Sequence, residues 1–194
     1  PAPVVTSELW RVVREQVFSR TLDELRRRGI SYKGVLYAGI MVTAKGPKVL
    51  EFNCRFGDPE TQPILFRLQS DLLEAIEAVI AGRLDRITLK WDPRPSICVV
   101  MASQGYPDTY PTGKEITGLK DAESADVAVF HAGTKRVGDK IVTAGGRVLG
   151  VTARGSTLAE AQRRAYQACE RIHFEGAYYR RDIGFRALGN PPRS

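Results

Sequence analysis

Residues 49–61 read Val49-Leu50-Glu51-Phe52-Asn53-Cys54-Arg55-Phe56-Gly57-Asp58-Pro59-Glu60-Thr61, and they hold three carboxylates, one carboxamide and one arginine. Residues 49–53 follow the period of a β-strand, so we expect Glu51 and Asn53 on one face and Leu50 and Phe52 on the other. Two neighbouring oxygen ligands suit a magnesium ion that bridges nucleotide phosphates, because this ion takes its other ligands from phosphate and water. The alternative is a half-exposed strand with a polar outer face.

The residues that follow this strand predict a turn into a helix. Asp58 is a suitable N-cap, and Pro59 suits the first helical position, where its missing N–H costs nothing. The N-terminus of such a helix, with Arg55 beside it, offers backbone donors and a planar cation to a phosphate or carboxylate substrate. We therefore predict Arg55 and Asp58 as catalytic residues. The alternative is that Asp58 only caps the helix and that Arg55 is its partner.

This motif and five further segments resemble the phosphoribosylamine-glycine ligase family, the glycinamide ribonucleotide synthetases of purine synthesis. The similar segments, in the order of that family, are 34–39 (Gly-Val-Leu-Tyr-Ala-Gly), 51–63, 99–102 with Gly105-Tyr106-Pro107, 130–135 (Phe-His-Ala-Gly-Thr-Lys), 145–149 (Gly-Gly-Arg-Val-Leu) and 181–184 (Arg-Asp-Ile-Gly). The resemblance covers nearly the whole chain. It implies an α+β fold, with the closing portion of an ATP-grasp lobe at residues 1–90 and a small α+β C-terminal domain at 91–194.

The resemblance also implies an activity. ATP would phosphorylate the carboxylate of glycine to give glycyl phosphate, and the amine of 5-phosphoribosylamine would displace the phosphate in de novo purine biosynthesis. ATP is then a substrate, and Mg²⁺ or Mn²⁺ is the expected metal. Two alternatives stay open: another ATP-grasp carboxylate-amine ligase or carboxylase relative, and a basic nucleic-acid-binding module without catalysis.

By the same resemblance, Glu51 and Asn53 hold the metal and Arg55 neutralises charge on the phosphoryl or acyl-phosphate oxygens. Leu50 is expected to contact the nucleotide, and the alternative is a core leucine. Many ATP-grasp enzymes carry a further acidic ligand on the preceding strand, where this sequence has Tyr37-Ala38-Gly39. The resemblance therefore supplies two protein ligands, and a third from elsewhere stays open.

Composition bounds these expectations. Hydrophobic residues make up 43% of the sequence, which suffices for a real core. The formal charge of +7 permits a polyanion partner, but the run at residues 26–28 ends a predicted helix, where cations usually face solvent. We expect no nucleic-acid partner. Three widely spaced cysteines favour a reducing cytoplasm, and no apolar run predicts a membrane span.

The first residues, Pro1-Ala2-Pro3, include no initiator Met and no secretory signal. We therefore expect a chain cut from a longer protein. The missing N-terminal part of the same enzyme is then a partner, and the chain alone is expected to be inactive.

Hydrophobic periodicity, together with capping and turn residues, predicts the remaining elements. In the first half, we expect a helix at 7–28 capped by Thr6 or Ser7, then a strand at 32–42 and a turn at 45–47. A second helix is expected at 71–81, capped by Ser70, and a domain boundary at 84–95. The apolar residues expected on one face of the second helix are Leu72, Leu73, Ile76, Val79 and Ile80. In the second half, we expect strands at 96–102, 127–131, 140–143 and 147–154, and the last two are expected to form a hairpin through Gly145-Gly146. A helix is expected at 157–172, with Thr157 and Glu160 as its capping box.

Overall fold

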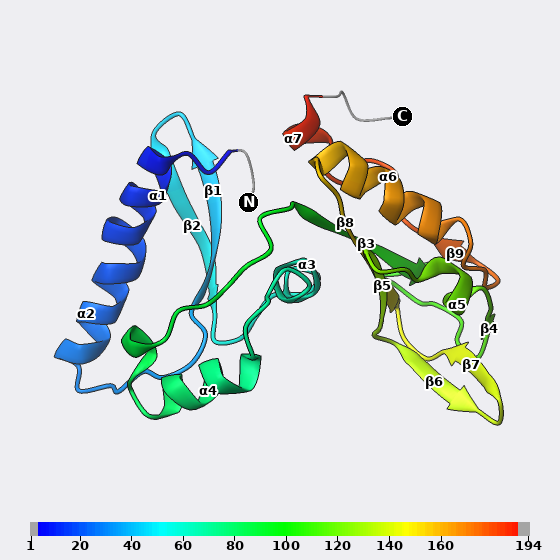
Figure 1. The fold of residues 1–194 in the computed structure, drawn as a ribbon, viewed down its shortest axis with the longest axis horizontal. Helices are drawn as coiled ribbons and strands as arrows, with labels where there is room; N and C mark the ends of the chain where they lie inside the picture. Colours follow the sequence, from blue (N-terminus) through cyan, green and yellow to red (C-terminus); the bar gives the residue numbers. More distant parts are fainter. Residues whose placement is uncertain (1–3, 190–194) are drawn as a thin grey trace. The chain divides into compact units, whose positions relative to one another are not determined.

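The computed structural model describes residues 4–189 and divides into two compact units. The first unit runs to Gly57 and resumes at Gln69–Lys90, and the second comprises Asp58–Leu68 and the chain from Trp91 onward. The chain thus passes from one unit to the other inside the polar stretch, between Gly57 and Asp58. Figure 1 shows the elements of each unit.

The first unit consists of a long helix, a β-hairpin and a shorter helix. Its elements are α1 (Ser7–Val13), a π-helical segment η1 (Arg14–Ser19), α2 (Arg20–Arg27), β1 (Tyr37–Thr43), β2 (Gly46–Asn53), α4 (Leu72–Ile80) and a 3₁₀ turn η2 (Leu84–Arg86). The predicted first helix is confirmed, with a π segment in its middle. Thr6 caps it by accepting a hydrogen bond from the N–H of Leu9 at 3.1 Å, and Val13 and Val17 on its inner side are buried.

The hairpin is antiparallel, and its first strand starts later than predicted. Residues 32–36 form a loop, so β1 begins at Tyr37. The turn occupies Ala44 and Lys45, since Thr43 pairs with Gly46, and Pro47 already belongs to β2. The predicted turn at 45–47 is therefore displaced toward the N-terminus.

Helix α4 is present, but its cap and its inner face differ from the prediction. Asp71 is the cap and accepts the N–H of Leu73 at 2.8 Å, because the Ser70 hydroxyl accepts the N–H of Lys90 instead. The buried positions are Ala75 and Ala78. Three large apolar side chains of the predicted inner face are exposed: Leu73, Ile76 and Ile80. They recur at spacings of three and four, so they form a separate exposed stripe on the helix.

The second unit is an α+β structure with a continuous core. Its elements are α3 (Thr61–Leu65), β3 (Ser96–Ser103), β4 (Glu115–Ile116), α5 (Leu119–Ala122), β5 (Val127–His131), β6 (Thr134–Val137), β7 (Lys140–Thr143), β8 (Arg147–Arg154), α6 (Leu158–Cys169), β9 (Ala177–Tyr178) and α7 (Phe185–Leu188). One sheet has the order β5-β8-β3-β9, and the other has the order β4-β7-β6. Helix α6 packs on β3 and β8 and buries Ala161 and Ala165 against them (Figure 1).

Gly145-Gly146 is not a hairpin turn, contrary to the prediction. β7 pairs with β4 and β6, whereas β8 pairs with β3 and β5, so the glycines carry the chain from one sheet to the other. Both positions are crowded. A Cβ on Gly145 would lie 3.0 Å from the Cα of Gly133, and a Cβ on Gly146 would lie 2.2 Å from the ring of Tyr106. The absence of side chains permits close packing rather than a tight turn.

The capping of α6 is confirmed in substance. Thr157 accepts the N–H of Glu160 at 3.1 Å, and the Glu160 carboxylate accepts the N–H of Ser156 at 2.7 Å. The return bond thus reaches the residue before the cap rather than the cap itself. The helix ends at Cys169, and Ile172 is buried beyond it.

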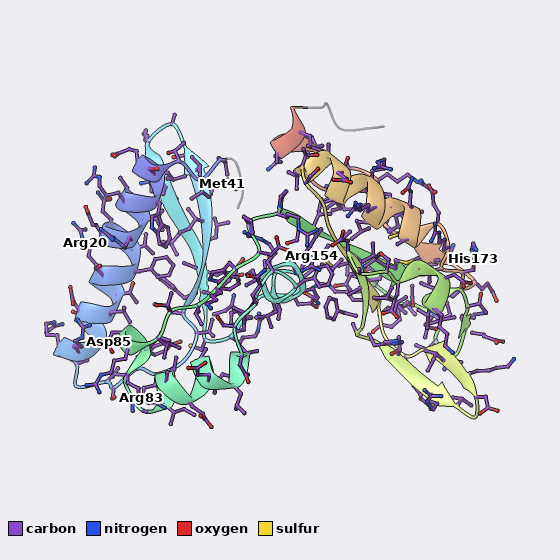
Figure 2. All side chains as sticks on the ribbon, viewed as in Figure 1. Arg20, Met41, Arg83, Asp85, Arg154 and His173 are labelled. Carbon is purple, nitrogen blue, oxygen red and sulfur yellow. The ribbon has the colours of Figure 1, made fainter. Side chains whose placement is uncertain are left out.

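An ion-pair network fixes the segment at which the chain re-enters the second unit after Lys90. The buried carboxylate of Asp92 accepts hydrogen bonds from Arg94 at 2.7 Å and from Arg154 at 3.3 Å, and both arginines also pair with Asp126. Arg154, labelled in Figure 2, also lies over the ring of Phe66 at 4.3 Å. Hydrogen bonds from the side chain and backbone of Arg94 lower the pKa of Asp92 to about 2. Ionised Asp92 therefore joins the segment after Trp91 to the sheet.

Asp92→Asn is expected to lower the thermal midpoint of the chain at neutral pH. A carboxyl group whose pKa is lower in the folded state contributes stability above its unfolded pKa of about 3.9. That contribution declines as the pH falls toward the folded pKa of about 2. Thermal unfolding of both proteins, followed by circular dichroism, should therefore show midpoints that differ less and less as the pH is lowered from about 4 to about 2. The exposed Asp139→Asn is the control, and equal midpoints at neutral pH would contradict an ionic role of Asp92.

Candidate active site

Glu51 and Asn53 lie next to each other at the end of β2, as the alternation predicted. The Asn53 amide donates to Glu51 Oε1 at 3.2 Å, so the two side chains share a face. In β1, Gly39 stands opposite Glu51. A Cβ on Gly39 would lie 3.2 Å from the Glu51 Cγ, so the glycine leaves room for the glutamate side chain. The hairpin therefore presents a carboxylate and a carboxamide together.

Leu50 occupies an irregular position in the same strand. Gly39 pairs with Glu51 and Ile40 pairs with Val49, so Leu50 is the extra residue of a β-bulge. Its side chain is 65% exposed, so the alternative interpretation as a core leucine is wrong for the described residues. Phe52 is also exposed. A bulge beside a polar pair re-aims the neighbouring side chains, and the strict alternation expected for this strand is broken there.

Arg55 follows the end of β2 in an exposed segment of the first unit. Its guanidinium donates to the backbone carbonyl of the next residue, Phe56, at 2.9 Å. Cys54 beside it is a free and exposed cysteine. The cation of Arg55 is thus presented on a short loop, between the hairpin and the point where the chain enters the second unit.

Asp58 does not cap a helix, contrary to the prediction. Helix α3 begins at Thr61 with Glu60 as its N-cap, and residues 58–60 form a turn in which the Asp58-Pro59 bond is cis. The carboxylate is engaged elsewhere: Oδ1 accepts the amide of Gln62 at 3.1 Å, and Oδ2 accepts Nη1 of Arg147 at 3.1 Å. The carboxylate thus links the first turn of α3, through Gln62, to the first residue of β8.

Arg147 is the residue of this cluster that sequence reasoning did not select. It opens β8, and besides the Asp58 carboxylate its Nη1 reaches the Asp58 backbone carbonyl at 2.7 Å. Its Nε donates to the hydroxyl of Tyr106 at 2.9 Å. The segment 145–149 is among those that resemble the ligase family, but the sequence analysis assigns its glycines to a turn and Arg147 to the start of a strand, with no role in the site. The arginine and the aspartate are 89 residues apart, so no local pattern joins them.

The two buried cysteines of the second unit are poor nucleophiles. Burial raises the pKa of the Cys98 thiol to about 11 and that of the Cys169 thiol to about 12. Both remain protonated at neutral pH, and the thiolate is the reactive form. Among residues 4–189, no group of three or more His, Cys, Asp and Glu side chains is placed to hold a metal. The carboxylate and amide of β2 are two adjacent oxygen ligands.

The fold agrees with that of ATP-grasp proteins. A family model of the phosphoribosylglycinamide synthetase ATP-grasp (A) domain matches residues 1–61. The crystal structure of N5-carboxyaminoimidazole ribonucleotide synthetase from Thermotoga maritima superposes with a TM-score of 0.58 over 88% of this chain and 43% of that chain. Because the two sequences are only 14% identical, this similarity supports the fold alone. The α+β chain described above is thus of the ATP-grasp class.

A second family model, the phosphoribosylglycinamide synthetase C domain, matches residues 96–186. The chain is 55% identical over 189 residues to the phosphoribosylamine-glycine ligase of Vibrio cholerae. The matched region covers 97% of this chain and 44% of that relative. The crystal structure of phosphoribosylamine-glycine ligase from Thermotoga maritima superposes with a TM-score of 0.79 at 36% identity, over 92% of this chain and 44% of that one. The chain belongs to the phosphoribosylglycinamide synthetase family. It spans less than half the length of these relatives.

In the part of the chain that the structure describes, no helix is long and apolar enough to cross a membrane.

Proposed function

We propose that this sequence is part of an ATP-dependent ligase that joins glycine to 5-phosphoribosylamine in purine biosynthesis. The observation that carries the proposal is the polar pair at the end of β2, in a chain that is 55% identical to a curated phosphoribosylamine-glycine ligase. The relatives are more than twice as long as the matched region, so the proposed reaction also uses residues outside this sequence. The complete protein that contains this chain is called the complete ligase below.

The residues of the first unit suit phosphoryl chemistry. Glu51 and Asn53 bring an anionic and a neutral oxygen ligand to one face, which fits Mg²⁺ or Mn²⁺ bound mainly by phosphate and water. The ion, when bound with ATP, would supply charge neutralisation at the phosphates. Arg55 adds a planar cation for the oxygens of the transferred phosphoryl group or of an acyl phosphate. The exposed side chain of Leu50 is available to contact the base or ribose of ATP.

We further propose that residues 1–90 form the closing part of the ATP-grasp domain and that residues 91–194 form the C-terminal domain. In this proposal, Asp58 is a catalytic residue, and glycine and 5-phosphoribosylamine are the substrates. A reducing cytoplasm is the proposed location, because all three cysteines are free thiols. The sequence similarity to ligases of this name favours this substrate pair over other ATP-grasp substrates.

The structure gives little support to the alternative of a basic nucleic-acid-binding module. The arginines at the end of α2 are paired within their own helix: Arg27 and Arg28 both contact Glu24, at 2.6 and 2.7 Å. Exposed pairs of this kind form an ordinary solvated surface. A salt titration of binding to random duplex DNA distinguishes the readings, since micromolar and steeply salt-dependent affinity would favour the module.

The complete ligase is expected to release phosphate from ATP only when glycine and 5-phosphoribosylamine are both present. The 194-residue chain alone is expected to release none, because it spans only 44% of the ligases it resembles. A coupled phosphate-release assay with each substrate omitted in turn measures both expectations. Phosphate release from the complete protein that does not depend on glycine would count against the proposed carboxylate substrate.

A further inference from the structure

The turn that contains Asp58 is held by two side chains of the second unit, those of Arg147 and Gln62. Arg147 holds both the backbone carbonyl and the carboxylate of Asp58, at 2.7 and 3.1 Å, and Gln62 holds the other carboxylate oxygen. Arg147 therefore recognises the backbone as well as the side chain. A guanidinium can do this because its donors are fixed in one plane and point in different directions.

Arg147 is itself held in place by its surroundings. Its backbone carbonyl accepts the N–H of Gly133 at 2.9 Å, and it pairs with Ala102 beside a register shift in β3. Its side chain bonds to the Tyr106 hydroxyl and lies 5.8 Å from the centre of that ring. The Tyr106 ring packs so closely on Gly146 that a Cβ there would collide with it. The guanidinium thus occupies a built position and not a freely mobile one.

The covalent chain carries this constraint into the candidate active site. Asp58 is the first residue of the second unit, and Gly57 is the last residue of the segment that carries Arg55. The turn that Arg147 fastens is therefore one end of the loop 54–57, and Arg55 lies three residues before Asp58. Three residues of chain span at most about 11 Å, so a fixed turn limits where Arg55 can lie.

We propose that Arg147 is a positioning residue of the ligase, which fixes the Asp58 turn and thereby the loop that presents Arg55. This inference rests on the proposed function. A purely structural salt bridge is the competing account. The side chains of Arg147 and Asp58 are 41% and 51% exposed, and exposed pairs contribute little to stability. The two accounts therefore differ in activity rather than in folding.

Arg147→Ala in the complete ligase tests the proposal. We expect kcat to fall about 10²-fold at saturating glycine, 5-phosphoribosylamine, ATP and Mg²⁺, because small misplacement of a catalytic group costs that much. The thermal midpoint should shift no more than in the control Lys140→Ala, which removes an exposed salt bridge to Glu115 in the same unit. Arg147→Lys should recover part of kcat, since lysine keeps the charge but cannot hold the turn and Tyr106 together.

The double variant Arg147→Ala with Asp58→Ala adds a second readout. If Arg147 acts through the turn, the loss in the double variant should be well below the product of the two single losses. Near-normal kcat in folded Arg147→Ala would overturn the positioning role, as would independent losses in the double variant. Should Arg147→Ala not fold, Arg147→Lys and Tyr106→Phe carry the test, and normal kcat in both would overturn the proposal. Absence of glycine-dependent turnover in the unsubstituted complete protein would instead refute the proposed function.

Discussion

Glu51→Gln in the complete ligase is expected to lower kcat/KM by roughly 10²-fold or more at limiting magnesium, since removal of groups that merely support metal ligands already costs 10- to 100-fold. The substitution keeps the shape of the side chain and its contact with Asn53, which is 3.2 Å away, but it removes the only formal negative charge of the pair. Asn53→Asp should cost less, because it keeps an oxygen ligand and adds a charge that a dication tolerates.

The magnesium dependence separates a metal site from a polar strand face. If the pair holds the ion, a rising magnesium concentration should restore part of the activity of Glu51→Gln by mass action. Steady-state kinetics of both variants across a magnesium series measure this recovery. A strand face without a ligand predicts normal kinetics and a stability change within about 0.5 kcal/mol. Unchanged activity of Glu51→Gln at limiting magnesium would remove the metal assignment.

Arg55→Lys should mainly lower kcat, by about 10²- to 10³-fold, the cost of losing one donor aimed at developing charge. Lysine retains the positive charge but not the planar fork that binds two oxygens at once. In the structure the guanidinium donates to the backbone carbonyl of Phe56, and this bond does not engage a carboxylate.

Single-turnover kinetics with ATP and glycine should place this defect in the chemical step. Lys48→Arg, at an exposed position on the same hairpin, serves as the matched control for an exchange between the two basic residues. Wild-type turnover of Arg55→Lys would show that the charge alone suffices or that the residue has no part in the reaction.

Local sequence patterns predicted most of the helices and strands, and they predicted the part of the site geometry that lies within one strand. The first helix followed from apolar spacing, and the adjacency of Glu51 and Asn53 followed from the two-residue period of a strand. Periodicity does not report register, however, so the bulge at Leu50 and its exposure could not be predicted. The apolar stripe on α4 was likewise visible in the sequence, but the pattern does not say whether a partner covers it.

Contacts between distant segments account for the remaining errors. Gly145-Gly146 looked like a turn because glycine pairs signal backbone freedom, whereas here they admit Gly133 and the Tyr106 ring. Asp58 looked like a cap because Asp-Pro often begins helices, yet its partner is Arg147, 89 residues later. A local reading assigns a polar side chain to its neighbours, and it fails where a distant cation makes the stronger contact.

The assignment of Asp58–Leu68 to the second unit bears on how this protein can be divided for expression. A clone that starts at Trp91 would omit α3, although the Ser96 hydroxyl donates to the Pro63 carbonyl at 2.6 Å and Phe66 packs edge-on against Phe130. Those contacts would be replaced by solvent on β3, β5 and β8. A separately produced C-terminal domain would therefore be more stable with residues 58–68 supplied as a fused or added peptide. The peptide and the domain would then complement each other as the halves of a split protein do.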